Sequence, residues 1–112
     1  MTQIEKIARL MGWKFLETVD YEGEPYHIVC KGAEGTVGFN PLTDQSDLMD
    51  VECALGIDVL HDEEYITAEY WQHGLLEFDD KKRIANYAHN KFTARSAAVC
   101  AVAEQIYDKG KV

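Results

Sequence analysis

The sequence predicts an α+β fold, in which a mostly antiparallel sheet of about four strands is packed by three helices in an α-β-α sandwich-like arrangement. Apolar residues recur at helical spacing near both ends and in the middle of the chain, whereas the segments between them favour strands. The strand-like segments follow one another through turn-rich loops, so hairpins are expected and not βαβ units. Since the 112 residues contain no linker-like stretch, residues 1–112 are expected to form a single domain.

The N-terminal segment predicts a helix over residues 3–11. Thr2 and Glu5 have the spacing of a capping box, in which the threonine hydroxyl accepts a hydrogen bond from the glutamate N–H. Apolar residues then recur at i, i+3, i+4 and i+7 from Ile4, which gives the helix one apolar face. Gly12 is expected to end the helix in the left-handed conformation.

Two strands, over residues 14–19 and 26–31, are expected to form a hairpin because a turn-rich loop over residues 20–25 separates them. Residues 36–40 are expected to form a short additional strand.

The middle of the chain predicts a second helix over residues 44–55. Thr43 is the expected N-cap, and Gly56 is the expected left-handed residue after the last turn. The buried side of this helix is expected to consist of Leu48, Val51, Cys53, Ala54 and Leu55.

The last part of the chain predicts strands over residues 65–71 and 75–78, and a further strand over residues 83–89 that pairs with 65–71. Small and apolar residues at helical spacing then predict a helix over residues 94–107, capped by Thr93. Segment 65–71 has bulky residues on both faces, which favours helices on both sides of the sheet.

Charge is distributed unevenly along the chain. The formal net charge is −9, and residues 32–80 contain no Lys or Arg but 13 of the 20 Asp and Glu residues. That segment therefore has a formal charge of −13 and the remainder of the chain +4. Because a one-signed segment creates a directed field, the expected partner is a positively charged protein or nucleoprotein complex, without direct high-affinity binding to nucleic acid.

The cysteines and the apolar segments limit the cellular context. Cys30, Cys53 and Cys100 are far apart and flanked by apolar residues, so we expect buried free thiols. The first ten residues are not an apolar run, and no apolar stretch approaches the ~18–20 residues of a membrane helix. A cytoplasmic protein without membrane binding is therefore expected, and no motif for a nucleophile, a phosphate or another cofactor occurs.

Three segments, in the first, middle and last thirds of the chain, carry motifs of one family. They are residues 7–13 (IARLMGW), 40–47 (NPLTDQSD) and 95–103 (RSAAVCAVA). In these motifs the chain resembles small bacteriophage and prophage proteins with the phage ABA sandwich domain. The resemblance implies an α-β-α fold and a phage origin, and it implies no catalytic residue.

Acidic and aromatic residues in the middle of the chain are the candidate partner-binding residues. Carboxylates pair with Arg and Lys side chains, and Tyr and Trp are frequent anchors of protein interfaces. The predicted set is Asp44, Asp47, Asp50, Asp62, Glu63, Glu64, Glu69, Tyr70, Trp71, Glu77, Asp79 and Asp80.

Other interpretations of these residues stay open. Asp44 and Asp47 lie in the first turn of the second predicted helix, where the helix dipole stabilises each by about 0.3–1 kcal/mol. His61 and the acidic residues 62–64 lack the spacing of a calcium or zinc site, which favours a solvated loop. The basic residues between Lys81 and Arg95 indicate at most a weak contact with nucleic acid.

The leading functional hypothesis is a non-enzymatic phage accessory protein that binds a basic protein surface through its acidic middle. In its more specific form, the protein is an anti-CRISPR-like inhibitor that occupies a host nucleic-acid-binding defence complex by DNA mimicry. The alternative is a homo-oligomeric structural or scaffolding module, such as a homodimer, with Trp13 and Trp71 in its self-interface. The third is a small metal-binding enzyme built on His61 and the adjacent acids.

Overall fold

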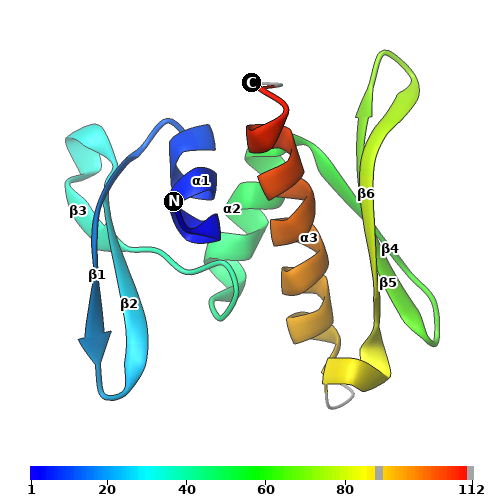
Figure 1. Cartoon of the computed structure of the whole chain (residues 1–112), viewed down its shortest axis with the longest axis horizontal. Helices are drawn as coiled ribbons and strands as arrows, with labels where there is room; N and C mark the ends of the chain where they lie inside the picture. The colour runs from blue at the N-terminus through cyan, green and yellow to red at the C-terminus, as the bar shows by residue number, and fades with distance from the viewer. Residues whose placement is uncertain (88–89, 111–112) are drawn as a thin grey trace.

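The computed structural model describes residues 1–87 and 90–110. Within them the chain forms three α-helices and two three-stranded antiparallel sheets, which confirms the α+β class. The predicted layers are wrong, because the strands form two sheets and the helices lie between them (Figure 1). Each sheet therefore buries one face against the helices, where an α-β-α sandwich would cover both faces of one sheet.

The N-terminal helix α1 (Gln3–Leu10) has the predicted cap: Thr2 Oγ1 accepts a hydrogen bond from the Glu5 N–H at 3.2 Å. The glycine that follows the helix, Gly12, has the expected positive φ of 81°. Local sequence signals were sufficient here because both ends of the helix are fixed by residues of the helix itself or next to it.

The first sheet contains the predicted hairpin, β1 (Lys14–Tyr21) with β2 (Glu24–Cys30), and the short strand β3 (Thr36–Gly38) beside β2. A 3-10 turn, η1 (Gly32–Glu34), connects β2 to β3. The hairpin turns at residues 22 and 23, both with positive φ (53° and 81°), which matches the right-handed twist of the strands.

The second helix, α2 (Gln45–Leu55), is capped by Asp44 and not by Thr43, because Asp44 Oδ1 accepts the Asp47 N–H at 2.9 Å. Leu48 and Val51 are buried as predicted. The predicted burial of Cys53 and Ala54 is wrong: both are exposed, since only one side of α2 faces the core, and Leu55 is half-buried.

The second sheet contains β4 (Ile57–His61), β5 (Tyr65–Gln72) and β6 (Leu75–Arg83), in that order. No strand was predicted for β4, which begins directly after Gly56 without a longer loop. The predicted strand 83–89 is wrong: β6 itself pairs with β5 and ends at residue 83. A 3-10 turn, η2 (Ile84–Tyr87), follows β6, and residues 88–89 of that prediction lie outside the described residues.

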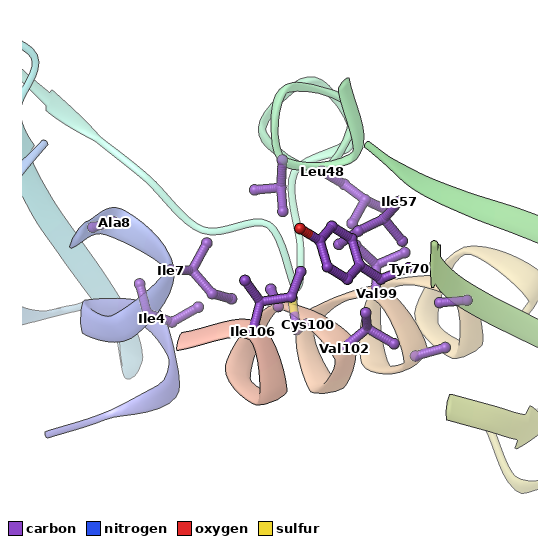
Figure 2. Packing of buried hydrophobic residues seen from close by; sticks show 14 of the residues in the cluster. Ile4, Ile7, Ala8, Leu48, Ile57, Tyr70, Val99, Cys100, Val102 and Ile106 are labelled. Atoms are coloured by element: carbon purple, nitrogen blue, oxygen red, sulfur yellow. The ribbon is translucent and has the colours of Figure 1, made fainter. Parts of the chain in front are cut away.

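The last helix, α3 (Lys91–Asp108), lies at the centre of the molecule. Its cap is Asn90, whose Oδ1 accepts the Thr93 N–H at 3.2 Å, so the prediction of Thr93 as the cap is wrong. Figure 2 shows side chains of α1, of α2 and of the second sheet, including Tyr70, around Val99 and Ile106 of α3. Since Val29 of β2 belongs to the same cluster, as does Phe39 directly after β3, one core joins both sheets.

The three cysteines differ in exposure. Cys100 on α3 is buried, whereas Cys30 is half-buried and Cys53 is exposed, so the prediction of three buried thiols is wrong for two of them. Burial raises the pKa of the Cys100 thiol to about 12, which makes it unreactive.

No helix among residues 1–87 and 90–110 is long and apolar enough to cross a lipid bilayer.

Candidate functional site

The outer face of the second sheet is not covered by any helix or strand of the described part of the chain (Figure 1). The central strand β5 alternates between the two faces: Ile66, Ala68 and Tyr70 are buried, whereas the residues between them are more exposed. Tyr70 therefore belongs to the core and not to the predicted contact surface. It stacks on Phe78 with 6.0 Å between the ring centroids.

The strand register places three acidic side chains in a row across this outer face. Asp58 of β4 lies opposite Glu69 of β5, and Glu69 lies opposite Asp79 of β6. Within the described residues, none of the three carboxylates forms an ion pair. Like charges directly opposite one another destabilise a sheet, so this acidic row (Asp58, Glu69 and Asp79) favours the approach of a cation.

An apolar pair lies next to the acidic row. Trp71 is 47% exposed and lies opposite Leu76, which is 43% exposed. The Trp71 Nε1–H donates a hydrogen bond to Glu69 Oε1 at 3.2 Å, so the indole ring is held beside the carboxylate.

Two rows of mixed character lie on the other side of the acidic row. The first contains Leu60, Thr67 and Lys81, and the second contains Tyr65 and Arg83. The Lys81 ammonium group lies 4.4 Å from the centre of the Tyr65 ring, a cation–π contact. We call the whole surface the β4–β6 outer face: Asp58, Leu60, Tyr65, Thr67, Glu69, Trp71, Leu76, Asp79, Lys81 and Arg83.

Only some of the predicted contact residues on β5 and β6 lie on this face. Glu69, Trp71 and Asp79 do, whereas Asp80 points to the opposite face, where its Oδ2 lies 3.1 Å from Lys82 Nζ. Glu77 is the extra residue of a β-bulge in β6, between the pairs at Phe78 and Leu76.

The predicted acidic loop, residues 62–64, lies at the end of the face that also carries Tyr65 and Arg83. Asp62 Oδ1 accepts hydrogen bonds from the Glu64 N–H at 2.8 Å and the Tyr65 N–H at 2.6 Å. These bonds hold the pKa of Asp62 below its usual value. Asp62 therefore stabilises its own turn through Oδ1, and Glu63 and Glu64 beside it are exposed.

The acidic residues of α2 lie in the helical layer, away from the β4–β6 outer face. Asp44 caps the helix, and Asp47 Oδ2 accepts the Asn40 N–H at 2.9 Å. Burial raises the pKa of Asp47 above its usual value. Asp50 is exposed. Helix capping and loop bonding thus account for two of the three, without a partner.

A groove of about 600 Å³ lies between the N-terminal end of α2 and the first half of β2, residues 24–27. Asp44, Asp47 and Glu24 line it together with Tyr26 and His27. Burial lowers the pKa of His27, whose Nδ1 lies 2.8 Å from Thr18 Oγ1. Pro25 also lines the groove. Because proline has no backbone N–H, this position cannot donate a hydrogen bond to a strand of a partner protein.

Trp13, proposed for a self-interface, is instead packed within the protein. Its ring meets Phe39 edge to face at 5.1 Å, and the Lys31 ammonium group lies 4.0 Å from its centre. Trp13 is half-buried by these contacts, so Trp71 is the more accessible of the two tryptophans.

Sequence reasoning missed Asp58, Leu60 and Leu76 as members of the face, and it treated Lys81 and Arg83 only as a basic cluster. The alternation of Asp58 and Leu60 with Ile57 and Val59 was the available signal. It was overlooked because no strand was expected between α2 and residue 65.

No group of three or more His, Cys, Asp or Glu side chains in the described residues is arranged to hold a metal ion. His61 instead lies 3.5 Å from Arg95, measured between Nε2 and Nη1.

Comparison of the chain with protein-family models, curated proteins and solved structures gives no match, and the resemblance to the phage ABA sandwich domain stays a prediction.

Proposed function

We propose that this protein is a non-enzymatic protein-binding module whose contact surface is the β4–β6 outer face. The acidic row carries the proposal, because its three carboxylates lie side by side between exposed apolar side chains and form no ion pair within the described part of the chain. A partner's Lys or Arg can place its cation on this row and its methylene groups on Trp71 or Leu60. The partner surface therefore combines basic and apolar residues.

A host nucleic-acid-binding protein in the cytoplasm is a partner with such a surface, so an inhibitor encoded by a phage fits this proposal. The arrangement supports a local contact better than mimicry of a long DNA duplex. Most of the acidic residues predicted for contact fall into three separate groups, at α2, in the loop 62–64 and in the acidic row, and Lys81 and Arg83 lie between the last two. Mimicry of a duplex needs negative charge repeated along an extended surface.

Titration with a synthetic peptide that alternates Arg or Lys with Leu tests the proposal. We expect NMR shift changes at the Trp71 indole N–H and at residues of the acidic row. The triple variant Asp58→Asn, Glu69→Gln, Asp79→Asn should weaken binding by about tenfold or more, or ~1.4 kcal/mol. Raising the salt concentration should weaken wild-type binding as well.

The matched control is Asp44→Asn, Asp47→Asn, Asp50→Asn, which removes the same number of charges from α2. It should retain the wild-type affinity. Equal affinity of the first triple variant and the wild type, or shift changes confined to α2, would contradict the proposal.

A further inference from the structure

We propose that, when no other partner occupies it, the β4–β6 outer face pairs with the same face of a second copy of this chain. The inference rests on the proposed role of this face as a contact surface, and it names a second copy as the competitor for that surface.

The charge of the face is the first argument. The face contains three acidic and two basic residues, a formal charge of −1, whereas the whole chain carries −9. Two copies repel one another over most of their surface, since like net charges disfavour association. The β4–β6 outer face is a region where that repulsion is nearly absent and where each copy offers cations to the other.

The order of the charges along the strands is the second argument. The acidic row, including Asp79, comes first, and Lys81 and Arg83 follow further along β6. A twofold axis parallel to the face and perpendicular to the strands, between Asp79 and Lys81, places each Asp79 over the Lys81 of the other copy. In an isologous interface every such contact occurs twice.

The same axis also matches the remaining rows. It places the row of Trp71 and Leu76 over the row of Tyr65 and Arg83 in the other copy, so aromatic rings and the Arg83 side chain meet across the interface. Asp58 and Glu69 then lie over Leu60 and Thr67, and no acidic residue of the row faces another. In this arrangement each Asp79 meets a Lys81, the row with Trp71 meets the row with Tyr65, and no carboxylate of the acidic row meets another.

The size of the face indicates a weak dimer. Three strands about 4.8 Å apart and about eight residues long at ~3.3 Å per residue span roughly 14 by 26 Å. That is about half of the ~800 Å² per partner found in stable interfaces. We therefore expect a dissociation constant on the order of 0.1 mM, so that a tighter partner displaces the second copy.

A charge-swap experiment tests the pairing by sedimentation velocity between about 10 μM and 1 mM, a range that brackets the expected dissociation constant. The wild type should shift from monomer toward dimer. Asp79→Lys leaves only cations at the two paired positions and Lys81→Asp leaves only carboxylates, so each variant alone should stay monomeric. An equimolar mixture of the two should form a heterodimer at least as tight as the wild-type dimer, because every paired position again joins opposite charges.

Two features of the design exclude other causes. Asp79→Lys makes the chain less acidic, so general repulsion cannot explain a loss of association in this variant. Asp50→Lys on α2 and Lys14→Asp on β1 introduce the same charge changes at exposed positions elsewhere, and they should dimerise like the wild type. Circular dichroism of each variant checks that it is folded.

A wild type that stays monomeric at 1 mM overturns the inference, as do single variants that dimerise normally or a mixture that stays monomeric. If those results occur while the Arg/Lys peptide still binds the acidic row, the proposed self-pairing is wrong and the proposed function stands. If the charge swap succeeds while the peptide binds the Asp58, Glu69, Asp79 triple variant normally, only the proposed function is wrong.

Discussion

A bidentate ion pair links α2 and α3, the two helices that contact the second sheet. The Arg95 guanidinium of α3 donates to both oxygens of Glu52 on α2, at 2.6 and 2.8 Å, and this pairing raises the pKa of Arg95 above its usual value. The Glu52 side chain is only 11% exposed. A bidentate and partly desolvated pair of this kind contributes more to stability than an exposed ion pair.

Glu52→Gln should therefore lower the free energy of unfolding by about 1–2 kcal/mol, because it removes a charge-assisted hydrogen bond. Urea denaturation measures the loss. The control is Glu5→Gln, which breaks the ion pair of Glu5 with Arg9 on α1 and should cost less than about 0.5 kcal/mol. Equal losses in the two variants would show that desolvation of Glu52 adds nothing.

Asp47 should make stability depend on pH in the opposite direction from most carboxylates. Burial raises its pKa in the folded state, so its contribution to stability is fully present below its unfolded pKa and is lost as the pH rises through the folded pKa. Asp47→Asn keeps an acceptor for the Asn40 N–H without the charge. The variant should therefore be more stable than the wild type at pH 7 and equal to it near pH 3, in about the range where an unfolded Asp is protonated.

Urea denaturation at several pH values between these limits tests the sign. Asp50→Asn, an exposed neighbour on the same helix, is the control. A wild type more stable than Asp47→Asn at pH 7 would mean that the hydrogen bond to Asn40 outweighs burial.

At the scale of elements, the three strands of the second sheet hold like charges next to one another, and no cation among residues 1–87 and 90–110 forms an ion pair with them. This arrangement lowers the stability of the sheet, whereas polar residues without charge at the same positions would not. Functional surfaces commonly retain such unfavourable groups because a partner stabilises them on binding.

Glu69→Gln should raise the free energy of unfolding by a few tenths of a kcal/mol, because it removes the central charge of the acidic row. The same variant should bind the Arg/Lys peptide more weakly than the wild type. Thermal denaturation and the peptide titration, done side by side, measure both effects. A variant that is less stable and binds equally well would indicate that Glu69 serves the fold through its bond to Trp71.

At the scale of the whole molecule, the helical layer makes the two sheets depend on one another. Buried residues of both sheets and of all three helices belong to one cluster around α3. Two sheets that share a core of this kind are expected to unfold together.

Val99→Ala, at a fully buried position on α3, should lower the free energy of unfolding by about 2–3 kcal/mol. Hydrogen exchange should show the same loss of protection for the slowest amides of β2 and of β5, since Val29 of β2 and Ala68 and Tyr70 of β5 belong to the same core as Val99. The exposed tip of the β1–β2 hairpin should exchange quickly in the wild type and the variant alike. Unchanged protection of β2 in the variant would show that the two sheets unfold separately.

The sequence was informative wherever the determining residues are neighbours. The Thr2 cap, the first hairpin and the extent of α1 and α2 depend on residues within a few positions of one another, and all were predicted to within two or three residues. The layer order was not predictable in this way. Tyr65 and Trp71 on the second side of β5 suggested burial on both faces, but no helix of the described residues lies over that side.

The candidate site was only partly predictable for a related reason. Glu69, Trp71 and Asp79 were identified by residue type, but their common face depends on the pairing of β5 with β6 and on the bulge at Glu77. Asp79 and Asp80 are adjacent in the chain and yet lie on opposite faces, because side chains alternate along a strand. The place of Asp58 beside them depends on β4, a strand that was missed.

The positions of the two tryptophans give this protein two separate optical signals. Trp13 packs against Phe39 and Lys31, so its fluorescence should change when the protein unfolds. Trp71 is 47% exposed on the β4–β6 outer face, and its indole N–H donates a hydrogen bond to Glu69. Its emission should therefore change when a partner covers that face. Trp71→Phe leaves Trp13 as a reporter of folding, and Trp13→Phe leaves Trp71 as a reporter of binding at the β4–β6 outer face. Neither measurement needs an added label.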